Sequence, residues 1–156
     1  MPASLPTGAG YRQIGMDHFV LPSDELALAA KKGKLRRNFM GYTIVTAKDW
    51  IGMGISAISY INNNFVQNHS TIDSYNRAID QGRLAVYRGL KLTLDDLIRQ
   101  HIISELMCNF QVDLRELSEK YGIDATDYLA GELRELEPFI QDGIAHIENN
   151  ILTVLP

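Results

Sequence analysis

The sequence predicts a mainly α-helical α+β chain that ends in a winged-helix-like region. Three amphipathic helix patterns with capping signals follow one another between residues 93 and 137. A β-hairpin pattern, IAHIENNILTVL, follows them at residues 144–155. Three helices followed by a hairpin give the outline of a winged helix, whereas the first half shows only short strand and helix patterns and no internal repeat.

The helices of the second half have clear start and stop signals. Thr93 caps the first in a capping-box pattern, Asp113 opens the second, and Gly122 ends it. The third is expected over residues 125–137, and Pro138 either ends it or begins one further turn.

The first half is less regular. Residues 11–21 are predicted to form one strand, followed by a helix that Ser23 caps and Gly33 stops. The remaining expectations, in chain order, are a basic loop or short strand at 34–43, a buried segment of undecided type at 49–61, a turn-rich loop at 62–68, and a helix from Ser70 to Gly82.

Composition excludes several classes of protein. The 156 residues are 46% hydrophobic and 22% charged, as is usual for a globular domain. No run of 18 apolar residues is present, and the first ten residues lack the features of a secretory signal, so a cytoplasmic setting without membrane contact is expected. Cys108 is the only cysteine, which excludes an internal disulfide and an iron–sulfur site built from this chain alone.

Charge divides the sequence near residue 90. Residues 1–90 carry a net charge of about +4 and residues 91–156 one of about −8. This change of sign predicts two regions with that boundary. A winged helix that binds DNA must neutralise phosphates, so the acidic charge of the second region argues against nucleic acid as a partner.

Three short patterns have both a functional and a structural explanation. GMGISA at 52–57 fits a dinucleotide-binding loop, but no strand precedes it and no clear helix follows, which favours glycines used for close packing. The histidines at 18, 69, 101 and 146 lack metal-ligand spacing, so no metal ligand is expected in this chain. KKGKLRRNF at 31–39 is either a solvated loop or an anion site, because arginine binds carboxylate and phosphate bidentately.

Longer motifs carry a resemblance. The stretches GYRQIGMDHFVLPSDELALAAKKGKLRRNFMGYT, IGMGISAIS, YRGLKLTLDDLIRQHIISELMCNF and DGIAHIENNILTV occur in that order from residue 10 onward. Together they resemble the oxygen-independent coproporphyrinogen III oxidases, which are radical S-adenosylmethionine enzymes of haem biosynthesis. The related haem chaperones share the scaffold but lack MDHF and RNFMGY as written here.

The resemblance implies the end of a radical S-adenosylmethionine barrel and an active-site cover segment within residues 1–90, then the winged-helix-like domain at 91–156. It implies an oxidoreductase that decarboxylates coproporphyrinogen III to protoporphyrinogen IX with S-adenosylmethionine and a [4Fe–4S] cluster. The CxxxCxxC motif that holds the cluster is absent, as is most of the barrel. The chain is therefore expected to be a C-terminal portion, inactive alone, that binds no cofactor stably without the N-terminal barrel.

Site residues follow from the same resemblance. Ile58 matches a position that contacts S-adenosylmethionine, and Phe39 matches an aromatic position at the active site. Met40 stands where the family often has glutamine, so that a thioether replaces an amide. Asp17 and His18 would lie at the rim of the last barrel strand, where ligands gather, although a structural hydrogen-bonded pair is an equal alternative.

Charge alone suggests the substrate contacts. Coproporphyrinogen carries four propionates, so Arg36, Arg37 and Arg88 are candidates to bind carboxylate groups, with surface exposure as the alternative. No residue is assigned a catalytic role. Two other functions stay open: a free-standing winged-helix binding module, and a haem-handling accessory protein of the same superfamily, which a haem titration would distinguish.

Overall fold

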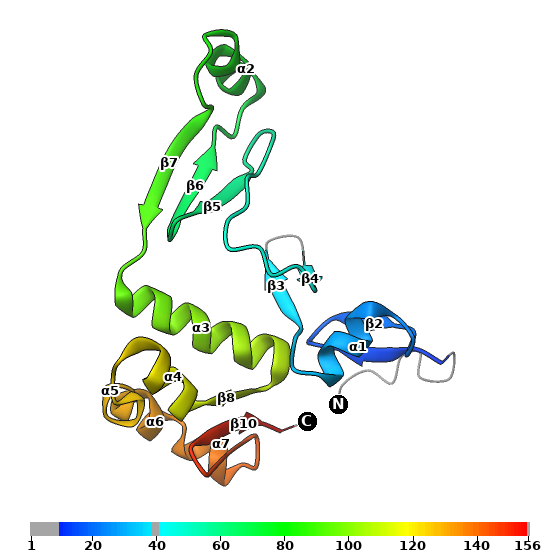
Figure 1. Ribbon diagram of the computed structural model, residues 1–156, viewed down its shortest axis with the longest axis vertical. Helices are drawn as coiled ribbons and strands as arrows, with labels where there is room; N and C mark the ends of the chain where they lie inside the picture. Colours follow the sequence, from blue (N-terminus) through cyan, green and yellow to red (C-terminus); the bar gives the residue numbers. More distant parts are fainter. Residues whose placement is uncertain (1–9, 39–40, 156) are drawn as a thin grey trace. The chain divides into compact units, whose positions relative to one another are not determined.

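The computed structural model describes residues 10–38 and 41–155 and is mixed helix and sheet, as the sequence predicts. Its contacts divide the chain into two compact units. Unit 1 contains residues 1–44 and 98–156, and unit 2 contains residues 45–97. Most elements of both are labelled in Figure 1. Within the described residues, none of the helices combines the length and the apolar character that a membrane span needs.

Unit 1 begins with a β-hairpin where the sequence analysis expected one strand over residues 11–21. Strand β1 (Arg12–Ile14) pairs antiparallel with β2 (His18–Val20). Gly15 has φ +55°, and this left-handed conformation reverses the chain between the two strands. The expectation of a single strand was therefore wrong, because the apolar run hides a turn.

Helix α1 (Glu25–Lys31) lies close to its expected position, but its cap differs. Asp24, and not Ser23, is the N-cap residue, and its side chain accepts a hydrogen bond from the Leu26 N–H at 2.8 Å. The chain then enters β3 (Arg36–Asn38), which pairs antiparallel with β4 (Gly41–Thr43). The basic segment is thus a pair of short strands. Their core contains Ile14, Leu35, Tyr42 and Cys108.

Unit 2 is a three-stranded antiparallel sheet with one helix. The strand order is β5 (Ile58–Ile61), β6 (Asn64–Asn68), β7 (Val86–Lys91), and helix α2 (Ile72–Asp80) connects the last two. Thr71, and not Ser70, caps α2.

Two expectations for unit 2 were wrong. Residues 64–68 form a strand, where a loop was expected over 62–68. The segment 49–61 is not uniformly buried, since Ile51 is 75% and Met53 88% exposed. GMGISA leads into strand β5 and not into a helix, which agrees with the expectation that its glycines serve close packing and not a dinucleotide.

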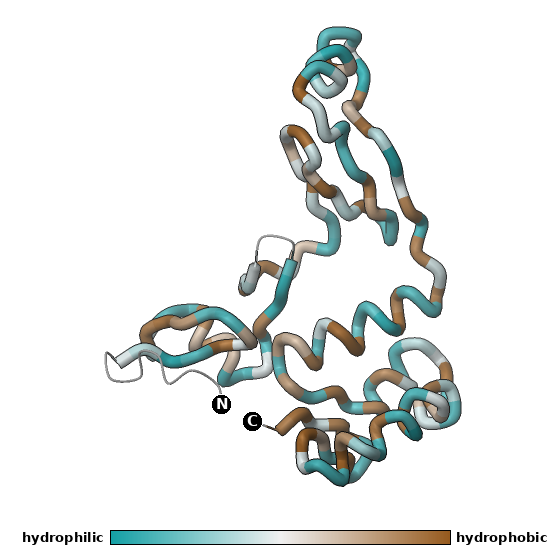
Figure 2. The backbone as a smooth tube through the Cα atoms, turned by 180° about the vertical axis from the view of Figure 1, so that it is seen from behind, coloured by the Kyte–Doolittle hydropathy of each residue, from teal (hydrophilic) through white to brown (hydrophobic). Residues whose placement is uncertain are grey.

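Helix α3 (Leu94–Asn109) begins with the predicted capping box. The Thr93 N–H donates to Oδ2 of Asp96 at 2.8 Å, and the Asp96 N–H donates to Oγ1 of Thr93 at 3.2 Å. Hydrophobic and hydrophilic positions alternate along the helix (Figure 2). Ile98 on its inner face is fully buried.

The elements that follow α3 in the chain pack against it (Figure 1). Strand β8 (Gln111–Asp113) leads into α4 (Leu114–Tyr121), which ends as predicted at Gly122, with φ +65°. The expected single helix over 125–137 is divided into α5 (Ala125–Tyr128), α6 (Ala130–Glu135) and α7 (Glu137–Gln141), and Pro138 lies in the first turn of the last.

The hairpin at the end of the described chain is confirmed. Strands β9 (Ala145–Glu148) and β10 (Ile151–Val154) are joined by Asn149 and Asn150, both with positive φ. Strand β8 adds to β10 on its other side and gives the order β8-β10-β9. The buried core of this region is Ile98, Val112, Leu114, Leu117, Ala125, Leu129, Ala145 and Leu152.

Candidate functional site

Tyr42 joins three elements of unit 1 through its hydroxyl. The side chain is 8% exposed, on strand β4. Its Oη accepts a hydrogen bond from the Met16 N–H at 3.0 Å and donates one to the Met107 carbonyl at 3.1 Å. The β1–β2 turn, strand β4 and helix α3 are therefore held together at one phenol.

Asp17 and His18 lie beside this phenol. Nδ1 of His18 is 2.9 Å from Oδ1 of Asp17, and the His18 ring meets the Tyr42 ring edge-on at a centroid distance of 4.9 Å. The hydrogen bond from His18 is the main reason that the pKa of Asp17 lies below its usual value. Because the ionised carboxylate can only accept, Nδ1 carries the proton of the shared hydrogen bond.

Arg37 on strand β3 lies against the Tyr42 ring. It is the register partner of Tyr42 across the β3–β4 pair, and its Cζ lies 5.1 Å from the centre of the Tyr42 ring. This distance is typical of a cation–π contact. Its Nη1 atom is buried and has no hydrogen-bond partner among the residues that the structure describes. We call Asp17, His18, Arg37 and Tyr42 the Tyr42 cluster.

Arg36 points to a different set of partners. Its Nη1 donates to the Leu35 carbonyl at 2.8 Å and lies 3.6 Å from Oε1 of Glu105 on α3. Glu105 also accepts a hydrogen bond from Nδ2 of Asn109. Neighbouring residues of a strand point to opposite faces, so these two adjacent arginines meet different surroundings.

His101 is on the same helix, one turn from Glu105. Its Nε2 lies 4.0 Å from Oε1 of Glu105, and its Nδ1 lies 3.1 Å from Nζ of Lys120 on α4. Burial, and then the nearby ammonium of Lys120, lower the pKa of His101 below the usual value. The lowered pKa favours the neutral imidazole at pH 7, and His101 packs as a half-buried polar residue.

Two predicted residues lie in unit 2, on the same row of its sheet. Ile58 on β5 is the register partner of Gln67 on β6, and Gln67 is the partner of Arg88 on β7. Nε of Arg88 donates to Oε1 of Gln67 at 2.8 Å. Ile58 is half-buried and Arg88 is exposed. The aliphatic side chain and the guanidinium therefore share one face of the sheet.

The predicted site residues thus form three groups. The structure brings Asp17, His18 and Arg37 together around Tyr42, and it places Arg36 with Glu105. Ile58 and Arg88 flank Gln67 in the other unit. Phe39 and Met40 lie outside the described residues. Sequence reasoning missed Tyr42, although the GY pair after the basic run was a signal that an aromatic side chain lies close to that cluster.

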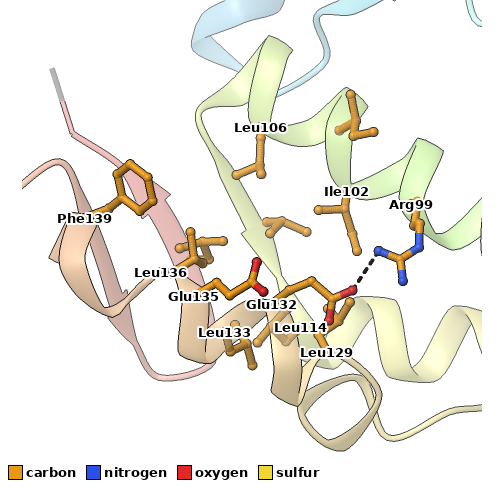
Figure 3. Close-up of a pocket in the computed structure, with 13 residues that line it drawn as sticks. Arg99, Ile102, Leu106, Leu114, Leu129, Glu132, Leu133, Glu135, Leu136 and Phe139 are labelled. Atoms are coloured by element: carbon orange, nitrogen blue, oxygen red, sulfur yellow. Dashed lines mark hydrogen bonds and ion pairs between the residues drawn. The ribbon is translucent and has the colours of Figure 1, made fainter.

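An apolar groove is a further feature that the sequence did not reveal. It has a volume of about 360 Å³ and lies between α3 and the α5–α7 segment. Leu106, Leu136 and Phe139 line it, and an ion pair between Arg99 and Glu132, at 2.8 Å, spans its edge (Figure 3). The apolar spacing of α3 and of residues 129–136 indicated buried helix faces, but not that they leave a space between them.

The described residues do not fit an iron–sulfur cluster. They contain no group of three or more metal-ligating side chains. Cys108 is buried, and burial raises the pKa of its thiol, so it is a poor metal ligand. No step of a reaction is therefore derived through a cluster held by this chain.

The second half of the chain matches a known domain family over residues 92–154, described as the HemN C-terminal domain. An oxygen-independent coproporphyrinogen III oxidase of Salmonella typhimurium is 42% identical over 95% of this chain. A protein of the same name from Synechocystis is 42% identical over 96% of the chain.

A solved structure agrees with these relatives. It is described as coproporphyrinogen III oxidase (HemN) from Escherichia coli, a radical SAM enzyme, and it matches with a TM-score of 0.91 and 40% identity. The match covers 95% of this chain and 34% of that one. The similarity to HemN therefore extends well beyond its C-terminal domain, and the resemblance predicted from the sequence is confirmed. The chain spans about one third of the length of these relatives, 32% for the Salmonella protein.

Proposed function

We propose that this chain is the C-terminal part of an oxygen-independent coproporphyrinogen III oxidase, and that it forms one wall of the site for substrate and S-adenosylmethionine. The observation that carries the proposal is the similarity of nearly the whole chain to enzymes of that name, at 42% identity. The reaction is the oxidative decarboxylation of two propionates of coproporphyrinogen III. The chain alone is inactive, because its one buried cysteine cannot hold the cluster.

Of the two cofactors, only S-adenosylmethionine is proposed to contact residues of this chain. When bound in the whole enzyme, the [4Fe–4S] cluster and S-adenosylmethionine supply the radical that removes hydrogen from the substrate. Ile58 offers a half-buried aliphatic surface against which an adenine ring can pack, without polar atoms that compete for hydrogen bonds. Phe39 and Met40 belong to the same proposal. Such a surface does not hold the cofactor by itself, and the rest of the site comes from the N-terminal barrel.

The substrate contacts are proposed at the charged residues. Coproporphyrinogen III is a tetra-anion, and Arg36, Arg37 and Arg88 are the cations that face it in this proposal. Asp17 and His18 lie beside Arg37 in the Tyr42 cluster, where their hydrogen bond fixes the histidine ring next to the phenol. Their role is to position this edge of the site.

Finer features of the architecture belong to the proposal as well. The division into residues 1–90 and 91–156 is retained, with a winged-helix-like second region. Helices α3 and α4, the α5–α7 segment and the β8-β10-β9 sheet support that description. In the first region, β1 is the remaining candidate for the last barrel strand, since the predicted single strand is a hairpin.

A chimaeric enzyme tests the function. In it, this chain replaces the matching C-terminal part of the Salmonella typhimurium relative, and the protein is purified and reconstituted without oxygen. We expect the chimaera to convert coproporphyrinogen III to protoporphyrinogen IX, measured by chromatography of the oxidised porphyrins, and we expect the isolated chain to make none. A folded chimaera with a full cluster and no turnover would contradict the proposal.

The same chimaera tests Ile58. Ile58→Asp places a charge against the adenine, and desolvation of that charge costs several kcal/mol, so cleavage of S-adenosylmethionine should fall sharply while the cluster still assembles. Ile61→Asp is the matched control, because Ile61 is on the same strand and 41% exposed. Phe39→Ala should reduce turnover through lost packing. If cleavage by Ile58→Asp falls only as far as its lowered melting temperature explains, Ile58 is instead a core residue.

A further inference from the structure

The three candidate arginines differ in what their guanidinium groups already bind. Arg36 donates to the Leu35 carbonyl and lies near Glu105, and Arg88 donates to Gln67. Arg37 differs from both, because its Nη1 atom is buried and finds no hydrogen-bond partner in the described part of the chain. The ionised guanidinium cannot lose its proton, so this N–H remains a donor that needs an acceptor.

The surroundings of Arg37 hold the group ready for such an acceptor. Its guanidinium lies over the Tyr42 ring, and the Tyr42 hydroxyl is fixed at both ends by Met16 and Met107. The two hydrogen bonds hold the phenol in place, and the Arg37 guanidinium therefore has a fixed surface to lie over. A planar group in a fixed orientation binds a carboxylate with little loss of side-chain entropy.

The neighbouring acid does not fill this role. The carboxylate of Asp17 accepts a hydrogen bond from Nδ1 of His18, on the side of the cluster where the histidine ring meets Tyr42. Asp17 is also largely exposed, with 59% of its side chain accessible. Its charge interacts with both His18 and Arg37, but within the described residues no hydrogen bond joins it to Nη1 of Arg37, which is left for a ligand.

We infer that Arg37 is the one of the three arginines that binds a propionate of the substrate through both oxygens, while Arg36 and Arg88 serve mainly to hold Glu105 and Gln67. This inference rests on the proposed function and refines it, because it assigns a specific carboxylate contact. It predicts that Arg37 controls substrate affinity more than the rate of the bound complex.

Steady-state kinetics of the chimaera test the assignment. Arg37→Gln can still form a hydrogen bond, but it removes the charge and the paired N–H donors of the guanidinium. We therefore expect KM for coproporphyrinogen III to rise at least about tenfold, with kcat within about threefold of the native chimaera. Arg37→Lys retains the charge only and should restore part of the affinity. Arg36→Gln and Arg88→Gln should raise KM less than Arg37→Gln does. Arg12→Gln, an exposed arginine of β1, is the matched control for the loss of one charge and should leave KM unchanged.

An equilibrium measurement separates this inference from the proposed function. Titration with coproporphyrin III, a stable tetracarboxylate, is compared with its tetramethyl ester for the native chimaera and each variant, by porphyrin fluorescence. The tetracarboxylate should bind more weakly to Arg37→Gln, and the ester should not respond to the substitution. If the native chimaera lacks turnover but shows this pattern, the function is wrong and the carboxylate contact stands.

Two results would overturn the inference. One is an unchanged affinity for coproporphyrin III in Arg37→Gln, which would mean that water satisfies Nη1. The other is full recovery of KM and melting temperature in Arg37→Lys, which would make Arg37 a structural cation over the Tyr42 ring. Melting temperatures of all variants are measured beside the titrations. If the Arg37→Gln protein fails to fold, Arg37→Lys alone decides, by whether KM and melting temperature recover partly or fully.

Discussion

The Tyr42 ring packs directly against the backbone of Gly15, so that a Cβ added to Gly15 would lie only 2.0 Å from Cζ of the ring. Gly15 also has φ +55°, which side chains other than glycine adopt at a cost. The position of the Tyr42 ring, over which Arg37 lies, therefore requires glycine at residue 15 of the β1–β2 turn.

Gly15→Ala should destabilise unit 1 by about 3 kcal/mol or more, from overpacking against the ring and from backbone strain together. Urea unfolding of the purified chain measures the change. Gly33→Ala is the control, since Gly33 has φ +62° but nothing within 4 Å of an added Cβ, and about 1–2 kcal/mol is expected there. Equal costs at the two positions would show that the ring yields to the methyl group.

Tyr42→Phe should cost about 1–3 kcal/mol, because it removes one hydrogen bond given by Met16 and one accepted by Met107 and leaves both backbone groups unpaired. The midpoint of urea unfolding reports the loss. Tyr11→Phe removes a hydroxyl from a residue that is 42% exposed and should change stability by no more than about 0.5 kcal/mol. A neutral Tyr42→Phe would mean that water replaces the phenol at both groups.

His101 should make the stability of the chain depend on pH. Its pKa is lower in the folded chain, so the unfolded chain binds the proton first as pH falls below 6.5. The free energy of unfolding should therefore decrease from pH 6.5 down to the folded pKa and then level off. His101→Asn should remove this slope, with stability at pH 8 used to correct for lost packing. A native chain with no slope in that window would contradict the assignment.

Cys108 should react slowly with thiol reagents in the folded chain. Its side chain is 4% exposed, and burial raises the pKa of the thiol, so little thiolate is present at pH 7. A colorimetric disulfide reagent should label less than one tenth of the protein while it is folded, and one equivalent after unfolding in guanidinium chloride. Rapid full labelling of the folded chain would show that the α3 end opens easily.

The elements predicted correctly are those with signals that are local in sequence. Thr93 and Asp96 are three residues apart, and Asn149 and Asn150 are adjacent, so each capping or turn pattern is complete within a few residues. The β1–β2 turn lacked such a pattern, since only Gly15 marks it. Strand β7 pairs with β6 across the α2 segment, and no local pattern encodes a partner at that distance.

The site was predictable only in part for the same reason. The contact of Asp17 with His18 follows from adjacency, but Tyr42 meets Met107 from 65 residues away. The difference between Arg36 and Arg37 follows from strand alternation, which a firm strand assignment at 36–38 would have indicated. The run of basic residues showed an anion site as one possibility, and only the contacts show which guanidinium already has partners.

The division of the chain also sets an order for folding during synthesis. Residues 45–97 form a continuous unit, whereas the other unit combines residues 1–44 with residues 98–156. A ribosome makes the chain from its N-terminus, so the sheet of unit 2 has all its strands before the Met107 carbonyl exists for the Tyr42 hydroxyl. The β1–β4 segment must therefore wait through the synthesis of more than fifty residues before Cys108 of α3 completes the core of Ile14, Leu35 and Tyr42.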